Sequence, residues 1–273
     1  MANKKMKVGI IGCGTIGTAL AEAIEQRFGR QARLVALSDI DSAKAKKLRA
    51  QCVLRPPIVN QDELIKKSDL IIEAAAAKSA LEIARNALAR KKDILLMSIG
   101  GILENAEELF RKAEVNKCRI YLPSGAIGGL DAVKAAAISK ITHATLITRK
   151  PPQGLAGAPY LKEHNIDVTA IKDETVIFEG TAAEAVKGFP QNVNVCALLS
   201  LAGIGPKKTR VRIIADPHTT ANSHEIEVAG DFGRLWVKTE NLPSPANPKT
   251  SILAFLSAIA TLQGILGKVK IGT

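Results

Sequence analysis

The sequence predicts an α/β protein of two domains, the first built on a parallel sheet and the second on a largely antiparallel one. Two patterns lead to this prediction. In the first half of the chain, short apolar runs alternate with segments of helical spacing, as in a parallel sheet with helices on both faces. In the second half, three apolar runs follow one another with only short turns between them, which favours antiparallel pairing.

The length and composition agree with two domains. The chain has 273 residues, of which 47% are hydrophobic and 23% charged, the profile of a soluble globular protein that can bury a full core. We expect a first domain at 1–124, a second at 125–246, and a C-terminal helix within 247–273 that packs back towards the first domain.

In the first half, the expected strands are apolar β-type runs and the expected helices show amphipathic spacing. The strands lie at 7–11, 34–38, 70–73, 94–97 and 119–122, with a further short strand within 52–59. The helices lie at 15–28, 42–51, 62–67, 78–90 and 104–115. Strand and helix thus alternate through the whole first domain.

The second half begins with a glycine-rich turn, SGAIGG at 124–129, that leads into a helix. Strands are expected at 144–149, 175–178, 210–215, 224–229 and 235–239, and helices at 182–187, 193–201 and 252–266. The segment 150–164 contains three prolines and two glycines, so we expect an irregular excursion there.

The first strand is followed by Gly12, Gly14 and Gly17 in the spacing G-x-G-x-x-G, and a helix opens there. Gly12 allows the tight turn, Gly14 lets a pyrophosphate approach the backbone, and Gly17 lets helix and strand pack closely. Thr15 and Ile16, at the start of the helix, add N–H groups and the positive end of the helix dipole. The alternative is a glycine turn without a ligand, but the strand–turn–helix context favours a dinucleotide site.

Asp39 ends the second strand, 22 residues after Gly17. An acidic residue at this place accepts hydrogen bonds from the adenosine ribose and repels a 2′-phosphate, which predicts NAD as the cofactor. No arginine follows Asp39 directly, but Lys44 and Lys46 are near enough to leave NADP open. Small residues also follow the expected strands at 70–73, 94–97 and 119–122, in EAAAAKSA, MSIGGI and LPSGAIGG, which suits a cofactor lying flat across the strand ends. A plain tight turn is the alternative for each of these stretches.

The net charge of +12 raises the question of nucleic-acid binding. Aromatic residues make up only 3% of the chain, so platforms for base stacking are scarce, and the basic residues are scattered. We therefore expect a solvated basic surface that attracts anionic small molecules, such as dinucleotides and dicarboxylates, and no nucleic-acid partner.

The four cysteines lie far apart and include no C-x-x-C pair, which fits free thiols in a reducing cytoplasm. The four histidines show no H-x-x-x-H spacing, so no metal site is expected. No apolar run approaches roughly twenty residues, so we expect no membrane span. Gly12 and Gly14 interrupt the first apolar run, which favours a strand over a signal peptide.

Several stretches beyond the glycine motif are more specific, above all GFPQNVNV at 188–195 and NSHEI at 222–226. With PSGAIGGLDAVKAA, VRIIADP and NLPSPANPKTSILAF, they make nearly the whole chain resemble the short microbial type of the L-aspartate dehydrogenase family. That resemblance implies a Rossmann domain joined to an α/β domain like that of dihydrodipicolinate reductase, and a homodimer. It also implies NAD- or NADP-dependent oxidation of L-aspartate to iminoaspartate, which hydrolyses to oxaloacetate and ammonia or feeds NAD biosynthesis.

Carried over from the family, the active-site histidine falls on His224, and the cofactor contacts on the nicotinamide side fall on Ala126 and Asn192. A lone strand histidine is more often structural, but a base of near-neutral pKa suits the removal of a proton from the substrate ammonium group. His218 is the alternative base. Asn192 has an alternative role as a helix N-cap.

L-Aspartate carries two carboxylates, so its site needs cationic or N–H partners. Arg149, Lys150 and Lys249 are candidates, each with an equally plain role at the surface. Two other functions compete with the dehydrogenase: a related two-domain oxidoreductase acting on another amino acid or a semialdehyde, and a non-catalytic NAD-binding sensor. The motifs NSHEI and GFPQN argue against the first, and the lack of a helix-turn-helix segment against the second.

Overall fold

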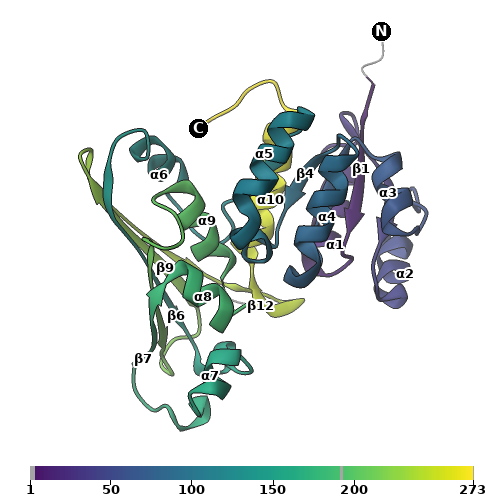
Figure 1. The fold of residues 1–273 in the computed structure, drawn as a ribbon. Helices are drawn as coiled ribbons and strands as arrows, with labels where there is room; N and C mark the ends of the chain where they lie inside the picture. Colours follow the sequence, from purple (N-terminus) through teal and green to yellow (C-terminus); the bar gives the residue numbers. More distant parts are fainter. Residues whose placement is uncertain (1–3, 191–192, 273) are drawn as a thin grey trace. The chain divides into compact units, whose positions relative to one another are not determined.

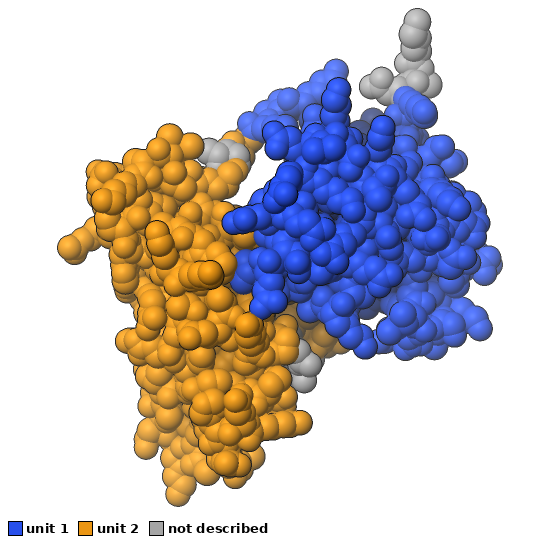
Figure 2. All heavy atoms as spheres, in the orientation of Figure 1, with its two compact units in different colours: residues 1–123, 255–270 blue, residues 124–254, 271–273 orange. Residues whose placement is uncertain are grey.

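A computed structural model describes residues 4–190 and 193–272, and it divides into two compact units. Unit 1 comprises residues 1–123 and 255–270, and unit 2 comprises residues 124–254 and 271–273 (Figure 2). Each unit has its own sheet, so the two are described separately.

Unit 1 is built on a five-stranded sheet in which all neighbouring strands run parallel. The strand order is β2 (Ala32–Ser38), β1 (Met6–Ile11), β3 (Leu70–Glu73), β4 (Asp93–Leu96) and β5 (Ile120–Tyr121). The central strands are buried on both faces, and every residue of β3 is inaccessible to solvent. This explains why their sequences read as continuous apolar runs and not as alternating ones.

Helices cover both faces of this sheet, as the alternation of the sequence predicts (Figure 1). The helical segments are α1 (Thr15–Gln26), α2 (Ser42–Gln51), α3 (Gln61–Lys67), α4 (Ala77–Ala89), the 3-10 helix η1 (Ile99–Asn105), α5 (Ala106–Asn116) and α10 (Ile252–Leu266). One core cluster joins Ile10 and Ile72 to α1 and to Leu262 of α10. The other joins Ile71 and Ile94 to α3, α4 and α5.

Unit 2 is built on a second five-stranded sheet, ordered β10 (Gly233–Asn241), β9 (Asn222–Gly230), β6 (Ile141–Lys150), β8 (Arg210–Ala215) and β7 (Thr175–Thr181). Three of the four neighbouring pairs are antiparallel, which confirms the largely antiparallel sheet. The pair β6 and β8 is parallel. A parallel pair needs a long crossover, and β7 with its following helices lies between these two strands in the chain.

One face of this sheet packs against α6 (Leu130–Ala136), α8 (Ala182–Gly188) and α9 (Asn194–Ala202), as Figure 1 shows. Alternate residues of β6 and β9 point into that core, whereas the residues between them lie on the opposite, partly exposed face. The central strands therefore have one core face and one accessible face.

Three details of the sequence-based prediction are wrong. Residues 52–59 form no strand but a single bridge between Leu37 and Ile58, because consecutive prolines cannot donate ladder hydrogen bonds. The excursion at 150–164 is not irregular throughout: it contains the 3-10 helix η2 (Pro152–Leu155) and the short α7 (Pro159–Glu163), each opened by a proline near its first position. A small hairpin, β11 (Pro243–Ser244) with β12 (Asn247–Ser251), was not predicted in the proline-rich stretch before α10.

Candidate active site

The glycine-rich loop between β1 and α1 has the shape that a dinucleotide site requires. Gly12 has φ +101°, and a Cβ there would lie 2.3 Å from the backbone of Ala74. A Cβ on Gly17 would lie 2.0 Å from the carbonyl oxygen of Gly12. A Cβ on Gly14 would meet nothing within 4 Å, so this residue faces open space at the N-terminus of α1. Two glycines thus serve packing, and Gly14 keeps the approach to the helix N-terminus clear, where Thr15 and Ile16 begin the first turn.

Asp39 lies directly after β2 with its carboxylate turned to the glycine-rich loop. Its Oδ2 accepts a hydrogen bond from the backbone N–H of Cys13 at 2.7 Å, and its Oδ1 accepts one from Asp41 at 2.8 Å. The side chain is half-buried, so each oxygen keeps lone-pair capacity for a ribose hydroxyl. The residues present at this edge of the sheet therefore fit an adenine dinucleotide.

Glu73, the last residue of β3, is fully buried and ties two strand ends together. Its carboxylate accepts hydrogen bonds from the backbone N–H groups of Ala75, Met97 and Ser98 and from the Ser98 hydroxyl, at 2.9 to 3.2 Å. Burial raises the pKa of Glu73 to about 7, and these hydrogen bonds oppose the rise. The carboxylate thus fixes the small-residue turns after β3 and β4, a contact that the small residues of these turns did not predict.

His224 lies in the middle of unit 2, on β9, with its side chain on the core face of the sheet. It is 4% exposed, and its Nδ1 lies 3.0 Å from the Thr148 hydroxyl oxygen on β6. Glu225 points to the other face, where it accepts a hydrogen bond from the Trp236 indole N–H at 2.8 Å, as strand alternation predicts.

The electrostatics of His224 differ from the expectation of a near-neutral base. Burial, with the charge of Lys150 as a second cause, lowers the pKa of His224 to about 3. The imidazole is therefore uncharged at neutral pH, and the lone pair on one ring nitrogen can accept a proton. An anion beside the ring would favour the imidazolium and make His224 a stronger base.

Ala126 lies in the turn before α6, and its carbonyl oxygen is held by β10. It accepts hydrogen bonds from the Thr239 hydroxyl at 2.8 Å and from the Asn241 side-chain amide at 3.0 Å. Thr239 is also the register partner of His224 across β9 and β10. The structure thus connects two of the predicted site residues, Ala126 and His224, through one threonine.

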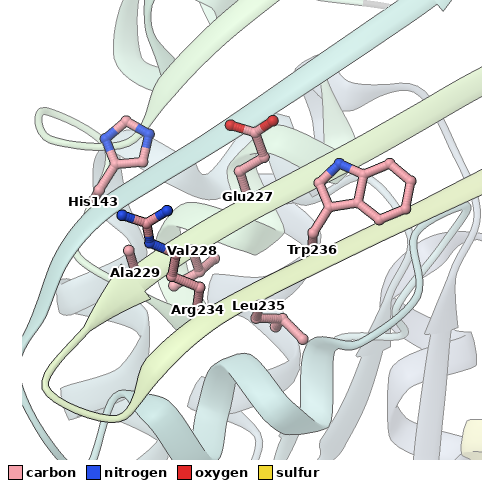
Figure 3. Close-up of a pocket in the computed structure, with 7 residues that line it drawn as sticks. All are labelled: His143, Glu227, Val228, Ala229, Arg234, Leu235 and Trp236. Atoms are coloured by element: carbon pink, nitrogen blue, oxygen red, sulfur yellow. The ribbon is translucent and has the colours of Figure 1, made fainter.

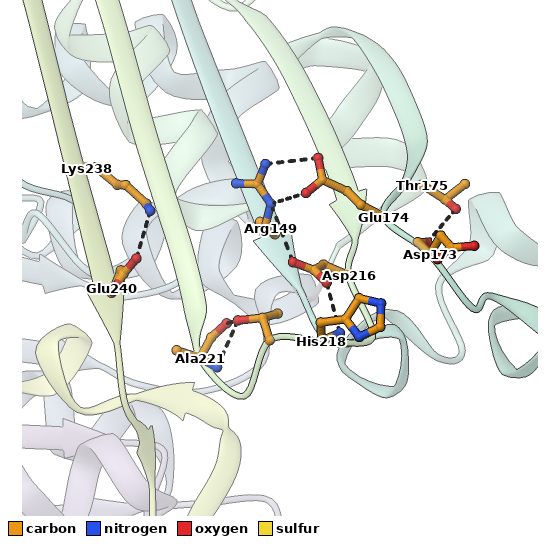
Figure 4. Close-up of polar contacts among 10 residues, drawn as sticks. Arg149, Asp173, Glu174, Thr175, Asp216, His218, Ala221, Lys238 and Glu240 are labelled. Carbon is orange, nitrogen blue, oxygen red and sulfur yellow. Dashed lines mark hydrogen bonds and ion pairs between the residues drawn. The ribbon is translucent and has the colours of Figure 1, made fainter.

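The candidate carboxylate partners separate clearly. Arg149 lies on the accessible face of the sheet, where it forms ion pairs with Glu174 at 3.1 Å and with Asp216 at 3.8 Å (Figure 4). Lys150 is 7% exposed and lies on the core face, the face of His224. His218, the alternative base, is exposed and is bound through its backbone N–H to Asp216.

Two predicted positions have no structural test. Asn192 lies outside the described residues, and so does the side chain of Lys249.

The pocket drawn in Figure 3, with a volume of about 510 Å³, lies away from His224, at the end of the sheet where β6, β9 and β10 meet. His143, Glu227, Arg234 and Trp236 line it from the accessible face.

Glu73 and Lys150 are distinguished by their burial, at 0% and 7% exposure. In the sequence, Glu73 belongs to the small-residue stretch EAAAAKSA, and Lys150 is one of three candidate partners for carboxylates. A charged residue at the end of an apolar strand is the available signal, because charged side chains are seldom fully buried without a partner or a role.

Comparisons with known proteins show which family the chain resembles. Residues 131–265 match the family model described as aspartate dehydrogenase, C-terminal, and residues 12–123 match that described as homoserine dehydrogenase, NAD binding domain. The chain is 48% identical to an L-aspartate dehydrogenase of Methanosarcina barkeri, over 98% of this chain and 100% of the relative. It is 41% identical to an L-aspartate dehydrogenase of Bradyrhizobium diazoefficiens, over 100% of this chain and 96% of the relative.

Solved structures show the same fold. The crystal structure of aspartate dehydrogenase from Thermotoga maritima superposes with a TM-score of 0.76 at 25% identity, covering 98% of this chain and 100% of that one. A homoserine dehydrogenase from Thiobacillus denitrificans has a TM-score of 0.65 at 12% identity, with 96% of this chain and 73% of that chain covered. The second likeness concerns the fold alone.

Proposed function

Because the chain belongs to the L-aspartate dehydrogenase family, we propose that it oxidises L-aspartate with NAD or NADP to iminoaspartate. The imine then hydrolyses to oxaloacetate and ammonia, or feeds NAD biosynthesis. The observation that carries the proposal is the buried imidazole of His224, hydrogen-bonded to Thr148, in a chain that also has a glycine-rich loop suited to a dinucleotide.

The reaction removes a hydride from Cα and a proton from the amino nitrogen of L-aspartate, and the C=N bond forms. The bound nicotinamide supplies the hydride acceptor. The Nε2 lone pair of His224 takes the proton from the substrate ammonium group, so that the neutral amine can release the hydride. The same imidazole then activates the water that hydrolyses the imine.

Cofactor binding is proposed for individual residues. Gly12, Gly14, Thr15, Ile16 and Gly17 are proposed to receive the pyrophosphate, because the loop leaves space at Gly14 and ends at a helix N-terminus. Asp39 is proposed to bind the adenosine ribose. Ala126 and Asn192 are proposed as contacts on the nicotinamide side. Thr239 and Asn241 support this role of Ala126, because they fix its carbonyl group.

The first test is an assay of initial rates with purified protein, NAD or NADP, and four substrates: L-aspartate, L-glutamate, L-homoserine and L-alanine. We expect NADH or NADPH to form with L-aspartate at the highest kcat/KM. A preference for L-homoserine would favour the related oxidoreductase, for which the match of residues 12–123 to a homoserine dehydrogenase domain gives a specific reason. Binding of NAD without turnover of any substrate would favour the sensor.

We also propose that the protein forms a homodimer through the accessible face of the unit 2 sheet. Trp236 and Val176 are 60% and 52% exposed on this face, among charges of both signs such as Glu227 and Arg234. Large aromatic residues and arginine are enriched at interfaces relative to the rest of the surface. Light scattering at micromolar concentration should show a dimer, and Trp236→Glu should shift it to a monomer. A monomeric wild type would contradict the proposal.

The four cysteines are free in the structure, and a reducing cytoplasm is the compartment that we propose. No helix among the described residues is long and apolar enough to cross a membrane.

A further inference from the structure

Lys150 is built into the same face of the sheet as His224. On β6, Leu146, Thr148 and Lys150 are all buried, at 1%, 3% and 7% exposure, and they alternate with residues of the accessible face. Thr148 is the register partner of His224 on the neighbouring strand and is hydrogen-bonded to its ring. Lys150 follows two positions later, so its side chain leaves the sheet on the side of the imidazole.

The surroundings of Lys150 bury its side chain and leave its ammonium group charged. Its stem packs under η2, where a Cβ on Gly154 would lie 3.7 Å from that of Lys150. Burial lowers its pKa to about 8, which leaves it charged at neutral pH, and that charge lowers the pKa of His224. Asp216, whose backbone N–H donates to the Lys150 carbonyl oxygen, turns its own carboxylate to Arg149.

A charged side chain is seldom buried at a strand end without a partner or a role. A buried, titratable cation on the same face as a candidate base is therefore a candidate for binding an anionic substrate. L-Aspartate offers two carboxylates, and its amino group must reach His224. The substrate therefore needs a positive charge beside the imidazole, and Lys150 supplies one.

We propose that the ammonium group of Lys150 binds a carboxylate of the amino-acid substrate beside His224. The inference rests on the proposed oxidation of L-aspartate and adds the residue that recognises its charge. The bound carboxylate would also place a negative charge beside the buried imidazole of His224. When the carboxylate is seated on Lys150, the repulsion that this lysine exerts on an imidazolium is offset, and His224 becomes a better base in the presence of substrate.

The test compares two variants that each remove one positive charge from adjacent positions, Lys150→Met and Arg149→Met. We expect Lys150→Met to raise the KM for L-aspartate roughly 10- to 100-fold, the usual effect of losing a charged hydrogen bond, with an unchanged KM for NAD. Arg149→Met should leave both constants near wild type. The melting temperatures of both variants, measured in parallel, separate an effect on substrate binding from an effect on the fold.

A readout without turnover separates the inference from the proposed function. Succinate carries both carboxylates of L-aspartate but no amino group, so it should raise the melting temperature of wild type and of Arg149→Met, and not that of Lys150→Met. If wild type fails to oxidise L-aspartate yet succinate stabilises it only when Lys150 is present, the proposed function fails and the carboxylate site stands. If Lys150→Met keeps the wild-type KM and the succinate response, the inference is overturned while the function stands.

Two further arms sharpen the assignment. Inhibition by L-asparagine, which retains only the α-carboxylate, should weaken in Lys150→Met if the lysine binds that group, and should not change if it binds the β-carboxylate.

The pH profile of kcat/KM gives independent support. In wild type it should fall as the pH rises through about 8, where Lys150 loses its proton, whereas in Lys150→Arg this fall should move to higher pH. An alkaline limb that does not move would count against the lysine.

Discussion

The hydroxyl oxygen of Thr148 lies 3.0 Å from Nδ1 of His224, and the two residues are direct partners across β6 and β9. This contact decides which ring nitrogen is available for chemistry. If Nδ1 carries the proton and donates to Thr148, then Nε2 presents a lone pair and can accept the proton of a substrate. The threonine is therefore a positioning residue for the proposed base.

Replacing Thr148 by Val should remove this control while keeping the shape of the side chain. We expect kcat with L-aspartate to fall about tenfold, since the ring loses the acceptor that holds its tautomer and orientation. Unfolding should become easier by about 1–3 kcal/mol, because a buried Nδ1 loses its partner. Thr148→Ser retains the hydroxyl and should recover most of kcat. Equal losses in the Val and Ser variants would show that packing is the cause.

Asp39 offers a test of cofactor choice. Asp39→Ala should weaken the binding of NAD more than that of NADP, because the carboxylate proposed to bind the ribose hydroxyls and to repel a 2′-phosphate is lost. The measurement is the ratio of the two KM values in wild type and variant. Because Asp39 also accepts the Cys13 N–H, Asp39→Asn serves as control: it keeps one acceptor oxygen and removes the charge. A ratio that stays constant in both variants would remove Asp39 from the site.

Glu73 should make stability depend on pH. Its pKa is raised from 4.5 to about 7, so the folded state binds more protons than the unfolded state between these values. The stability that this group contributes is therefore full below about pH 4.5 and is lost as the pH rises through about 7. The shift corresponds to about 3 kcal/mol. Urea unfolding of wild type at pH 5 and pH 8 should reveal the loss.

Glu73→Gln provides the comparison, because its amide does not titrate in this range. We expect the variant to be less stable than wild type at pH 5, since one amide N–H₂ now faces backbone donors, and to change much less between the two pH values. Parallel pH dependence in the two proteins would show that Glu73 keeps an ordinary pKa.

Most of the fold could be predicted from the sequence because periodicity reports burial. The runs at β1 and β3 read as continuous because both faces are covered, and the alternation in β9 shows one accessible face. The parallel pairing of β6 with β8 was missed, since strand order is set by tertiary packing and not by local pattern. The hairpin of β11 and β12 was missed because its prolines argue against strands.

The site was only partly predictable for a related reason. The glycine spacing has a meaning that is local to one turn, so the roles of Gly12 and Gly17 followed directly from it. Arg149 and Lys150 are adjacent, and their opposite orientations depend on which face of β6 meets the helices. The pKa of His224 depends on the burial of its ring and on the charge of Lys150 on the neighbouring strand, and no local sequence pattern contains either.

The role of His224 can be decided with one pair of variants. His224→Ala should lower kcat with L-aspartate roughly a hundredfold or more, the usual effect of losing a positioned general base. NAD titration should be unchanged, because Gly14 and Asp39 lie in the other unit. His218→Ala, which removes an exposed histidine six residues earlier, is the matched control and should keep wild-type kcat. A structural role for His224 predicts the reverse pattern, with strong destabilisation in thermal melts and near-normal turnover by the protein that stays folded. In that case His218 becomes the first candidate base.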